Sequence, residues 1–415
     1  MINTSRSASK RAPERQQTGV PRLQGVDTNV QKYYPALLTS VHAMLAVFAS
    51  MAVKGRTKPL CLIFETPSGY GKTATLQMAF ATDPGAFLTK LVYRSDKFTP
   101  RSFVSHAANV KKEEMPNLDM LPKLENKVLI TKELAPILRG RVEDLQENFS
   151  ILISVLDGKG FLSDSGMHGQ RGYDRPILFN WIGATTPLPA ATHRLMSQLG
   201  TRLLFFEVPA EPPTQEELKA FLRSADPEEA ERQCQRAVNN FLASFFGEHP
   251  VASVDPSAMV IPDHLEDQLV RWVSFLVAAR AEVHFEGEEP TAALPAEGPW
   301  KVAIYFKQLL YGHALMHDRR VIDESDIDLV AEVAISSTPG HLRKIIRALR
   351  TMPTVDAALT EKLCGVSRPT ARKYLQELNV LGIVTITQHG SDPTIAALRD
   401  EYAWLRTYPE NQMTV

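Results

Sequence analysis

A short apolar run that leads directly into a glycine-rich segment constrains this chain more than any other feature. Residues 60–64 have the length and composition of a buried parallel strand, and residues 73–80 continue with helical character. Between them, Gly69 and Gly71 allow the backbone to curl, so that its N–H groups point inward toward an anion. The start of the following helix adds the positive end of its dipole. This order predicts a phosphate-binding loop at the end of a strand in an α/β sheet.

The residue types in this segment suit a nucleoside triphosphate and a magnesium ion. Lys72 is placed to reach the β and γ phosphates, and the Thr73 hydroxyl is placed to ligate Mg²⁺. Seven of eight positions fit the Walker A sequence, and Thr66 stands where its first glycine is usual. The alternative is a glycine-rich turn that precedes a lysine by chance. We expect ATP and Mg²⁺ to contact the run Thr66, Pro67, Ser68, Gly69, Tyr70, Gly71, Lys72, Thr73 and Ala74.

A second apolar run, residues 127–131, leads to the acidic residue that a triphosphatase needs. Glu133 follows this run and is the candidate to polarise the attacking water. Lys132 stands where an aspartate that supports Mg²⁺ is usual, so either Glu133 does both jobs or a different acid serves the metal. The alternative is a surface glutamate at the end of a strand.

Apolar runs and helical periodicity divide the chain into four parts. Further strands are predicted at residues 88–93, 177–183 and 202–208. They alternate with helical patterns such as 142–156, and this alternation predicts a parallel α/β sheet. The expected parts are a disordered basic arm (1–25), an α/β core (26–211), a helical subdomain (212–338) and a C-terminal unit (339–415).

The helical parts have their own pattern. Residues 30–53 are expected to form one helix ahead of the first strand. In the helical subdomain we expect helices without strands between them, and a loop at residues 286–299. The helices are expected at residues 214–223, 227–246, 264–281 and 300–317.

Composition limits the partners and the compartment. The chain has 415 residues, which is too long for one core. Its formal net charge of −1 gives no general basic signal, so contact with DNA requires local patches. The three cysteines are far apart and form no metal or disulfide pattern, which fits the cytoplasm. The longest apolar run, residues 37–53, is interrupted by polar residues, and no membrane span is expected.

Taken together, these residues resemble the AAA+ ATPases. Residues 66–73 are similar to that family's G-P-P-G-T-G-K-T loop. Residues 181–186 resemble its sensor-1 strand, with Thr186 in place of the usual asparagine. Residues 199–205 resemble the segment that carries an arginine finger, which implies that Arg202 reaches the neighbouring subunit's γ-phosphate. Arg194 competes for this role, and pairing of Arg202 with an acid of its own chain is the alternative.

The resemblance extends over roughly residues 35–340 and implies a lid and a ring. Residues 299–326 resemble the family's helical lid, and Lys301 falls near the sensor-2 arginine, which contacts the nucleotide. The family works as rings, so the resemblance implies a homo-oligomer, commonly a hexamer, with ATP bound at the subunit interface.

Residues 157–175 form an insertion before the sensor-1 strand. Glycines at its turns predict a β-hairpin. The pre-sensor-1 hairpin branch of the AAA+ family, which includes the minichromosome-maintenance helicases, carries its insertion here. In helicases this hairpin grips one DNA strand in the ring pore; the alternative is a flexible surface loop. The resemblance implies DNA contacts from Lys159, His168, Arg171, Tyr173 and Arg175.

The C-terminal unit shows a helix-turn-helix pattern. A helix at residues 355–363 and a tight turn precede a helix that Ser367 caps, and residues 383–387 follow as the strand of a wing. Such winged helices bind DNA or a protein partner. The residues at the start of the recognition helix that we expect to contact DNA are Arg368, Thr370, Arg372 and Lys373.

Two functions fit these patterns. The first is an ATP-dependent DNA motor, similar to minichromosome-maintenance-like helicases of the compact kind found on phages and mobile elements. The second is a regulatory ATPase that assembles on DNA or on a partner protein without unwinding. DNA-stimulated hydrolysis and strand displacement distinguish the first from the second.

Overall fold

The computed structural model describes most of the chain. The described residues are 22–83, 85–105, 114–165, 169–199, 202–210, 214–216, 218–219, 227–287, 289–294, 298–387 and 394–408. Residues 1–21 of the expected basic arm and most of the helix expected at 214–223 lie outside them. Residues 22–25 were expected in the arm but begin helix α1 (Arg22–Tyr33), because Leu23 and Val26 are buried.

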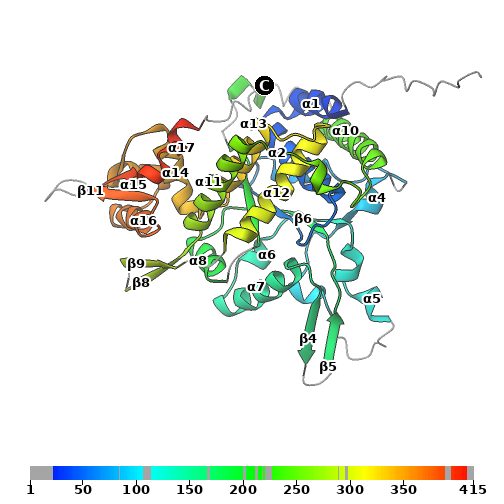
Figure 1. Ribbon diagram of the computed structural model, residues 1–415, viewed down its shortest axis with the longest axis horizontal. Helices are drawn as coiled ribbons and strands as arrows, with labels where there is room; N and C mark the ends of the chain where they lie inside the picture. The colour runs from blue at the N-terminus through cyan, green and yellow to red at the C-terminus, as the bar shows by residue number, and fades with distance from the viewer. Residues whose placement is uncertain are drawn as a thin grey trace, which may run out of the picture.

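A five-stranded parallel sheet forms the centre of the protein (Figure 1). Its order is β2-β3-β6-β1-β7, and each neighbouring pair is parallel. This confirms the α/β class with a parallel sheet. The strands are β1 (Cys61–Glu65), β2 (Val92–Arg94), β3 (Val128–Thr131), β6 (Asn180–Thr185) and β7 (Leu204–Glu207).

Two of the expected elements have different bounds. Residues 88–91, expected as part of a strand, form the short helix α4 (Leu88–Leu91), and only β2 after them is extended. Leu88 and Leu91 are both buried, and a spacing of three suits one face of a helix as well as a short apolar run. The helix expected at residues 30–53 is two helices, α1 and α2 (Leu38–Ala49), separated by a 3₁₀ turn that begins at Pro35.

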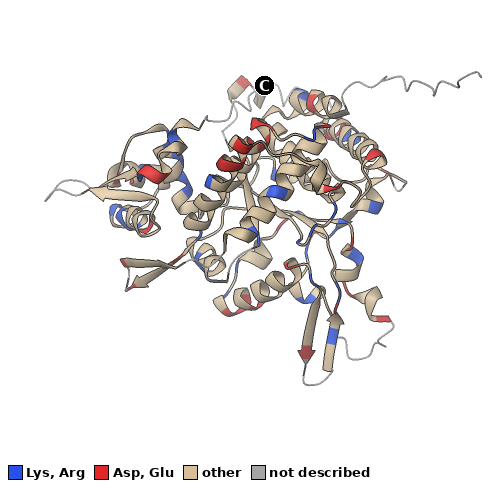
Figure 2. Ribbon diagram, in the orientation of Figure 1, with Lys and Arg blue, Asp and Glu red and all other residues tan. Residues whose placement is uncertain are grey.

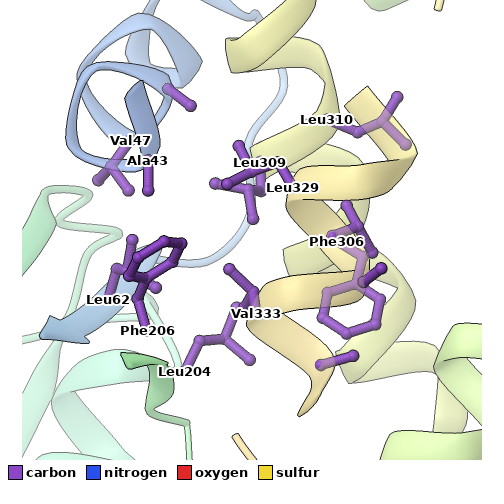
Figure 3. Close-up of a cluster of buried hydrophobic side chains, with 14 of the residues drawn as sticks. Ala43, Val47, Leu62, Leu204, Phe206, Phe306, Leu309, Leu310, Leu329 and Val333 are labelled. Atoms are coloured by element: carbon purple, nitrogen blue, oxygen red, sulfur yellow. The ribbon is translucent and has the colours of Figure 1, made fainter. Parts of the chain in front are cut away.

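The strands bury both faces, and each face has its own apolar cluster. Leu62 of β1 lies on the α2 side of the sheet together with Leu204 and Phe206 of β7 (Figure 3). Phe64 of β1 belongs to the same cluster. Cys61 and Ile63 of β1 alternate with them and face the opposite cluster. The helices over that second face are α6 (Ala135–Leu138), α7 (Val142–Leu156) and α8 (Ala190–Leu199), and α3 (Lys72–Gln77) follows β1.

The helical subdomain packs on the α2 side of the sheet. Its helices α12 and α13 contribute Phe306, Leu309 and Val333 to the same apolar cluster as α2 and β7 (Figure 3). The described helices are α10 (Pro227–Glu248), α11 (Asp263–Ala279), α12 (Pro299–Met316) and α13 (Glu324–Ser336).

The subdomain also contains a hairpin where the sequence predicted only helices and a loop. Strands β8 (Glu282–Glu286) and β9 (Glu289–Leu294) pair antiparallel. Gly287 has φ of +63°, which suits the turn between them. The strand signal is weak because the hairpin lies at the surface, where its side chains are only partly buried.

The C-terminal unit begins with α14 (Gly340–Thr351), which packs against α8, α13 and the helix pair that follows. Ser367 accepts a hydrogen bond from the Thr370 N–H and caps α16, as predicted, and Gly365 adopts φ of +65° in the turn before it. A three-stranded antiparallel sheet closes the unit in the order β10-β12-β11. Its elements are β10 (Val355–Asp356), α15 (Ala357–Cys364), α16 (Arg368–Val380), β11 (Val384–Thr387), β12 (Ile395–Leu398) and α17 (Trp404–Thr407).

The predicted insertion hairpin is present and projects from the body of the protein (Figure 1). Strands β4 (Phe161–Ser165) and β5 (Gly169–Tyr173) pair antiparallel. Gly172 has φ of +121°, and a Cβ there would collide with the Phe161 backbone, so the pair requires glycine at this position. The short helix α5 (Met115–Leu118) lies near the base of this hairpin.

One segment near the N-terminus has the length and composition of a membrane span. We expected polar residues to interrupt this run, but Pro35–Ala52 has a mean hydropathy of 1.6 over 18 residues and is apolar enough for a span by length and composition. However, 72% of the segment is buried inside the protein, where α2 packs between the sheet and α12. It is a core helix of this fold.

Candidate nucleotide site

The glycine-rich loop joins β1 to α3 at the carboxyl edge of the sheet. Gly69 and Gly71 have φ of +94° and +87°, in the region that favours glycine. The loop residues Pro67, Ser68 and Gly69 are exposed, so the loop opens to solvent. A Cβ on Gly71 would lie 2.7 Å from the Leu37 side chain, which packs beneath the loop. The local sequence therefore forms the curled loop that it predicted.

Lys72 is the first residue of α3 and is 7% exposed. Within the described part of the chain, no carboxylate forms an ion pair with it. Its ammonium brings a positive charge to the loop, and a bound anion would balance that charge. The loop, the helix N-terminus and this lysine together provide the donors that phosphate oxygens require. Thr73 is exposed beside Lys72, so its hydroxyl is accessible to a metal ion bound to the phosphates.

Thr66 replaces the usual first glycine of the loop. Its N–H donates to the Thr185 carbonyl at 3.3 Å, and this bond joins the start of the loop to β6. Its hydroxyl is buried and has no hydrogen-bond partner among the residues described. The side chain is therefore accommodated below the loop without closing it.

Three strand ends bring the predicted residues to one edge. β6 lies between β1 and β3, so Thr186 after β6 stands between the loop and Glu133 after β3. Thr186 is half-buried, and the Leu134 N–H donates to the Ala184 carbonyl at 2.8 Å, which ties this edge of β3 to β6. The carboxyl edge of an open parallel sheet is where such folds bind ligands.

Glu133 is half-buried and accepts a hydrogen bond from the Ala135 N–H at 3.0 Å. No cation of the described residues pairs with it. Lys132 turns away from it: its ammonium lies 3.8 Å from Asp96 and 5.3 Å from the centre of the Phe80 ring. Asp96 also binds Arg94 at 2.7 Å, and these contacts engage it away from a metal. Glu133 is therefore the acid at this edge that stays available for water or Mg²⁺.

Lys301, predicted to contact the nucleotide, lies at the other edge of the sheet. Gln308 of the same helix donates to the Lys58 carbonyl at 3.2 Å, just before β1 begins. From there α12 runs along α2 toward the P-loop side, since Gly312 contacts Ala46 and the later residue His317 contacts His42. Lys301 precedes Gln308 by two turns, about 10 Å further from the loop. The structure does not bring it to the glycine-rich loop.

Arg202, predicted to act on a neighbouring subunit, is engaged within its own chain. Its side chain is 6% exposed and donates to Asp157 at 3.2 Å. Burial raises the pKa of Asp157, but the hydrogen bonds from Arg202 and Lys58 outweigh it and hold the pKa below its usual value. Arg194 is exposed and lies over the Phe285 ring of β8 at 4.6 Å. The geometry favours the pairing alternative for Arg202 and leaves Arg194 accessible.

An arginine that the sequence reasoning missed lies next to the loop. Arg343 of α14 binds Glu65, the last residue of β1, at 2.7 Å, and both side chains are 3% exposed. The second Glu65 oxygen accepts from the Leu188 N–H at 3.0 Å. Arg343 also lies 3.4 Å from Glu207 at the end of β7. The signal in the sequence was Glu65 itself, since a carboxylate at the end of a buried strand requires a cation.

The insertion hairpin presents fewer basic groups than predicted. Arg175 pairs with Glu125 at 2.6 Å, and the Tyr173 hydroxyl donates to Asp119 at 2.8 Å. Burial and this hydrogen bond raise the pKa of Tyr173, and the bond ties its hydroxyl to Asp119 at the base of the hairpin. Arg171 is half-buried, with its guanidinium 3.5 Å from the Met115 sulfur.

The rest of the hairpin is close to neutral. Lys159 is exposed just before β4, and His168 lies outside the described residues. The charged residue of β4 is Asp164 and that of β5 is Arg171, and Figure 2 shows acidic colour on β4 and basic colour on β5. A continuous basic stripe is therefore missing from the described part of the hairpin.

The helix α16 presents basic residues at its start. Arg368 and Arg372 are exposed one turn apart, and Lys373 is half-buried. The Thr370 hydroxyl lies 2.9 Å from that of Ser367 and takes part in the cap. The opposite side of α16 meets β9 and His341, whose ring lies 4.8 Å from Tyr374. The start of this helix is thus exposed to solvent.

No model of a known protein family matches the chain, and no curated protein matches it either.

Proposed function

We propose that this chain is an ATPase of the AAA+ kind that binds ATP at the P-loop and acts on DNA as a ring-forming motor. The observation that carries the proposal is the loop itself: two glycines with positive φ, a helix N-terminus, and a buried lysine without a carboxylate partner among the described residues. Together they create a site for a polyanion that the protein does not fill with its own acids.

The residues around this loop fit Mg²⁺ and a hydrolytic water. Thr73 would offer its hydroxyl to the ion, and Glu133, which no described cation neutralises, would offer a carboxylate oxygen. When bound, Mg²⁺ neutralises charge on the phosphates. Lys72 holds the phosphates, Glu133 orients and deprotonates water, and Thr186 hydrogen-bonds to the water or the γ-phosphate. Each of these groups reaches the site from the carboxyl end of a parallel strand.

DNA contact is best supported at the C-terminal unit. Its order of helices and three strands is similar to a winged helix, and Arg368 and Arg372 are exposed at the start of α16. Two arginines on one turn suit phosphate contact, which supplies most of the affinity for DNA. If the chain is instead a regulatory ATPase, the same surface would bind a protein partner.

A regulatory ATPase is the second candidate, and the insertion hairpin favours it. A strand-gripping hairpin needs exposed basic or aromatic groups, whereas Tyr173 and Arg175 are bound to Asp119 and Glu125. In this function the ATPase assembles on DNA or on a protein through α16 and does not unwind. The Arg202 side chain is likewise engaged in its own chain, so a ring would use Arg194 at the subunit interface.

The proposal is tested by ATP hydrolysis and strand displacement with purified protein. Lys72→Ala should abolish hydrolysis and weaken binding of a fluorescent ATP analogue, and Glu133→Gln should abolish hydrolysis while preserving binding. Lys90→Ala, an exposed lysine on α4, is the matched control and should leave both unchanged. Full hydrolysis by the Lys72 variant would refute the site.

The motor and the regulator give different results with DNA. Stimulation by single-stranded DNA and displacement of a strand from a forked duplex support the motor. Hydrolysis that responds to duplex DNA or to a partner protein, with no displacement on any substrate, supports the regulator. Loss of the response in Arg368→Ala/Arg372→Ala would assign it to α16.

A further inference from the structure

Three histidines converge where α2 meets α12, apart from the proposed catalytic residues Lys72, Glu133 and Thr186. His42 lies on α2, His313 lies in the last turn of α12, and His317 caps the C-terminal end of that helix four residues later. One ring nitrogen from each of the three lies within 4.8 Å of the others. The His313 and His317 ring centres are 4.8 Å apart, and those of His42 and His317 are 5.8 Å apart.

Two of these rings are oriented from behind by carboxylates. His313 Nδ1 lies 2.6 Å from an oxygen of Asp326, and His42 Nε2 lies 2.7 Å from Asp27. Each contact engages one of the two nitrogens of its ring. A carboxylate behind an imidazole fixes the tautomer and orientation of a metal-binding histidine and raises its basicity.

The remaining nitrogen of His313 has no partner in the protein. The residue is 1% exposed, and its Nε2 is buried without a hydrogen bond to any of the described residues. A buried polar atom in this state costs free energy unless something binds it. The neighbours that share this space are the two other imidazoles, so the ligand that completes all three is one that accepts nitrogen lone pairs.

The charged groups around the cluster favour a cation in it. The acids behind the cluster are Asp27, Asp326 and Asp323, and Arg319 binds the last two at 2.6 and 2.8 Å. Three carboxylates against one guanidinium leave the shell with an excess of negative charge.

We propose that His42, His313 and His317 bind one divalent transition-metal ion between α2 and α12. Three neutral imidazoles with a fourth position open to water fit Zn²⁺, and imidazole ligands also suit Cu²⁺ and Ni²⁺. His42 and His317 are only partly buried, which leaves a path for the ion and for the water. Small rotations of the three side chains would bring their ring nitrogens, now within 4.8 Å of one another, to the spacing of a tetrahedral metal site.

Such an ion would hold α2, which begins beside the glycine-rich loop, against α12 of the helical subdomain. α2 begins directly after Leu37, whose side chain packs under Gly71 of the P-loop. α12 belongs to the helical subdomain, and it meets α2 along the same apolar cluster. A bound ion would hold this helix pair together without touching the phosphates.

The test uses untagged full-length protein made metal-free with a chelator. After equilibrium dialysis against buffered Zn²⁺, elemental analysis should find one ion per chain, and Zn²⁺ should raise the midpoint of thermal unfolding. Co²⁺ should give the intense visible absorption of a tetrahedral site, and Zn²⁺ should displace it. His264→Gln, an exposed histidine on α11, is the matched control and should behave as the wild type.

His42→Gln and His317→Gln should each lose the bound ion and the tetrahedral Co²⁺ absorption, with an unchanged circular dichroism spectrum. Equal zinc content in the wild type and in the double variant His42→Gln/His317→Gln would overturn the proposal. If the double variant does not fold, the wild type alone decides, because a weak octahedral Co²⁺ spectrum or no stoichiometric zinc would also overturn it. None of these readouts depends on ATP hydrolysis.

Discussion

Replacing Arg343 with methionine removes the cation from a buried ion pair at the base of the P-loop. Arg343 and Glu65 are each 3% exposed and lie 2.7 Å apart. Methionine keeps much of the aliphatic volume, so the change is mainly the loss of charge. It leaves the Glu65 carboxylate buried, with the Leu188 N–H at 3.0 Å as a remaining neutral donor. Breaking a pair of this kind costs about 3–5 kcal/mol of unfolding free energy.

An exposed ion pair supplies the matched control for this variant. Arg101 and Glu147 lie 2.6 Å apart, but their side chains are 73% and 49% exposed. Arg101→Met should therefore cost less than about 1 kcal/mol. The short distance is common to both pairs, so the difference between the two variants isolates the effect of burial.

A double variant separates the ion pair from simple loss of packing. Glu65→Gln removes the buried charge, so Glu65→Gln/Arg343→Met should be more stable than Arg343→Met alone. Urea unfolding followed by tryptophan fluorescence and by far-ultraviolet circular dichroism measures each variant, and both probes should shift together. Equal midpoints for Arg343→Met and Arg101→Met would refute the reasoning, as would a double variant less stable than Arg343→Met.

Two further predictions concern the loop and the engaged arginine. Gly71→Ala should weaken binding of a fluorescent ATP analogue at least tenfold, because φ of +87° and the Leu37 side chain 2.7 Å away oppose a Cβ, whereas Gly25→Ala in open space should bind normally. Equal affinities of the Gly71→Ala and Gly25→Ala variants for the analogue would contradict this prediction. Arg202→Met should lower the unfolding temperature at pH 7. The lowered pKa of Asp157 means that the stabilisation is present above the unfolded pKa of about 3.9 and is lost as pH falls through the folded value. The difference in unfolding temperature between wild type and variant should therefore narrow as the pH falls below the unfolded pKa, and a difference that stays constant would contradict the assignment.

Local signals account for the parts of the fold that were predicted correctly. The strand at residues 60–64 and the positive φ of Gly69 and Gly71 depend on neighbouring residues only. The same holds for the helix cap at Ser367, because its side chain accepts a hydrogen bond from the N–H of Thr370 only three residues later. The surface strands β8 and β9 gave no strand signal in the sequence. Apolar and polar residues alternate only weakly in a strand when neither of its faces is fully buried.

The sequence by itself determined a curled glycine-rich loop on a parallel sheet, because the strand, the turn and the helix all lie within the single segment 61–77. Tertiary structure alone decided which charges are free to act. It paired Arg202 with Asp157, placed Lys301 at the far edge, and brought Arg343 to Glu65 from 278 positions away. It also brought His42 beside His317. Such contacts depend on how distant helices pack on the sheet, and packing between distant segments leaves no periodic pattern in the sequence.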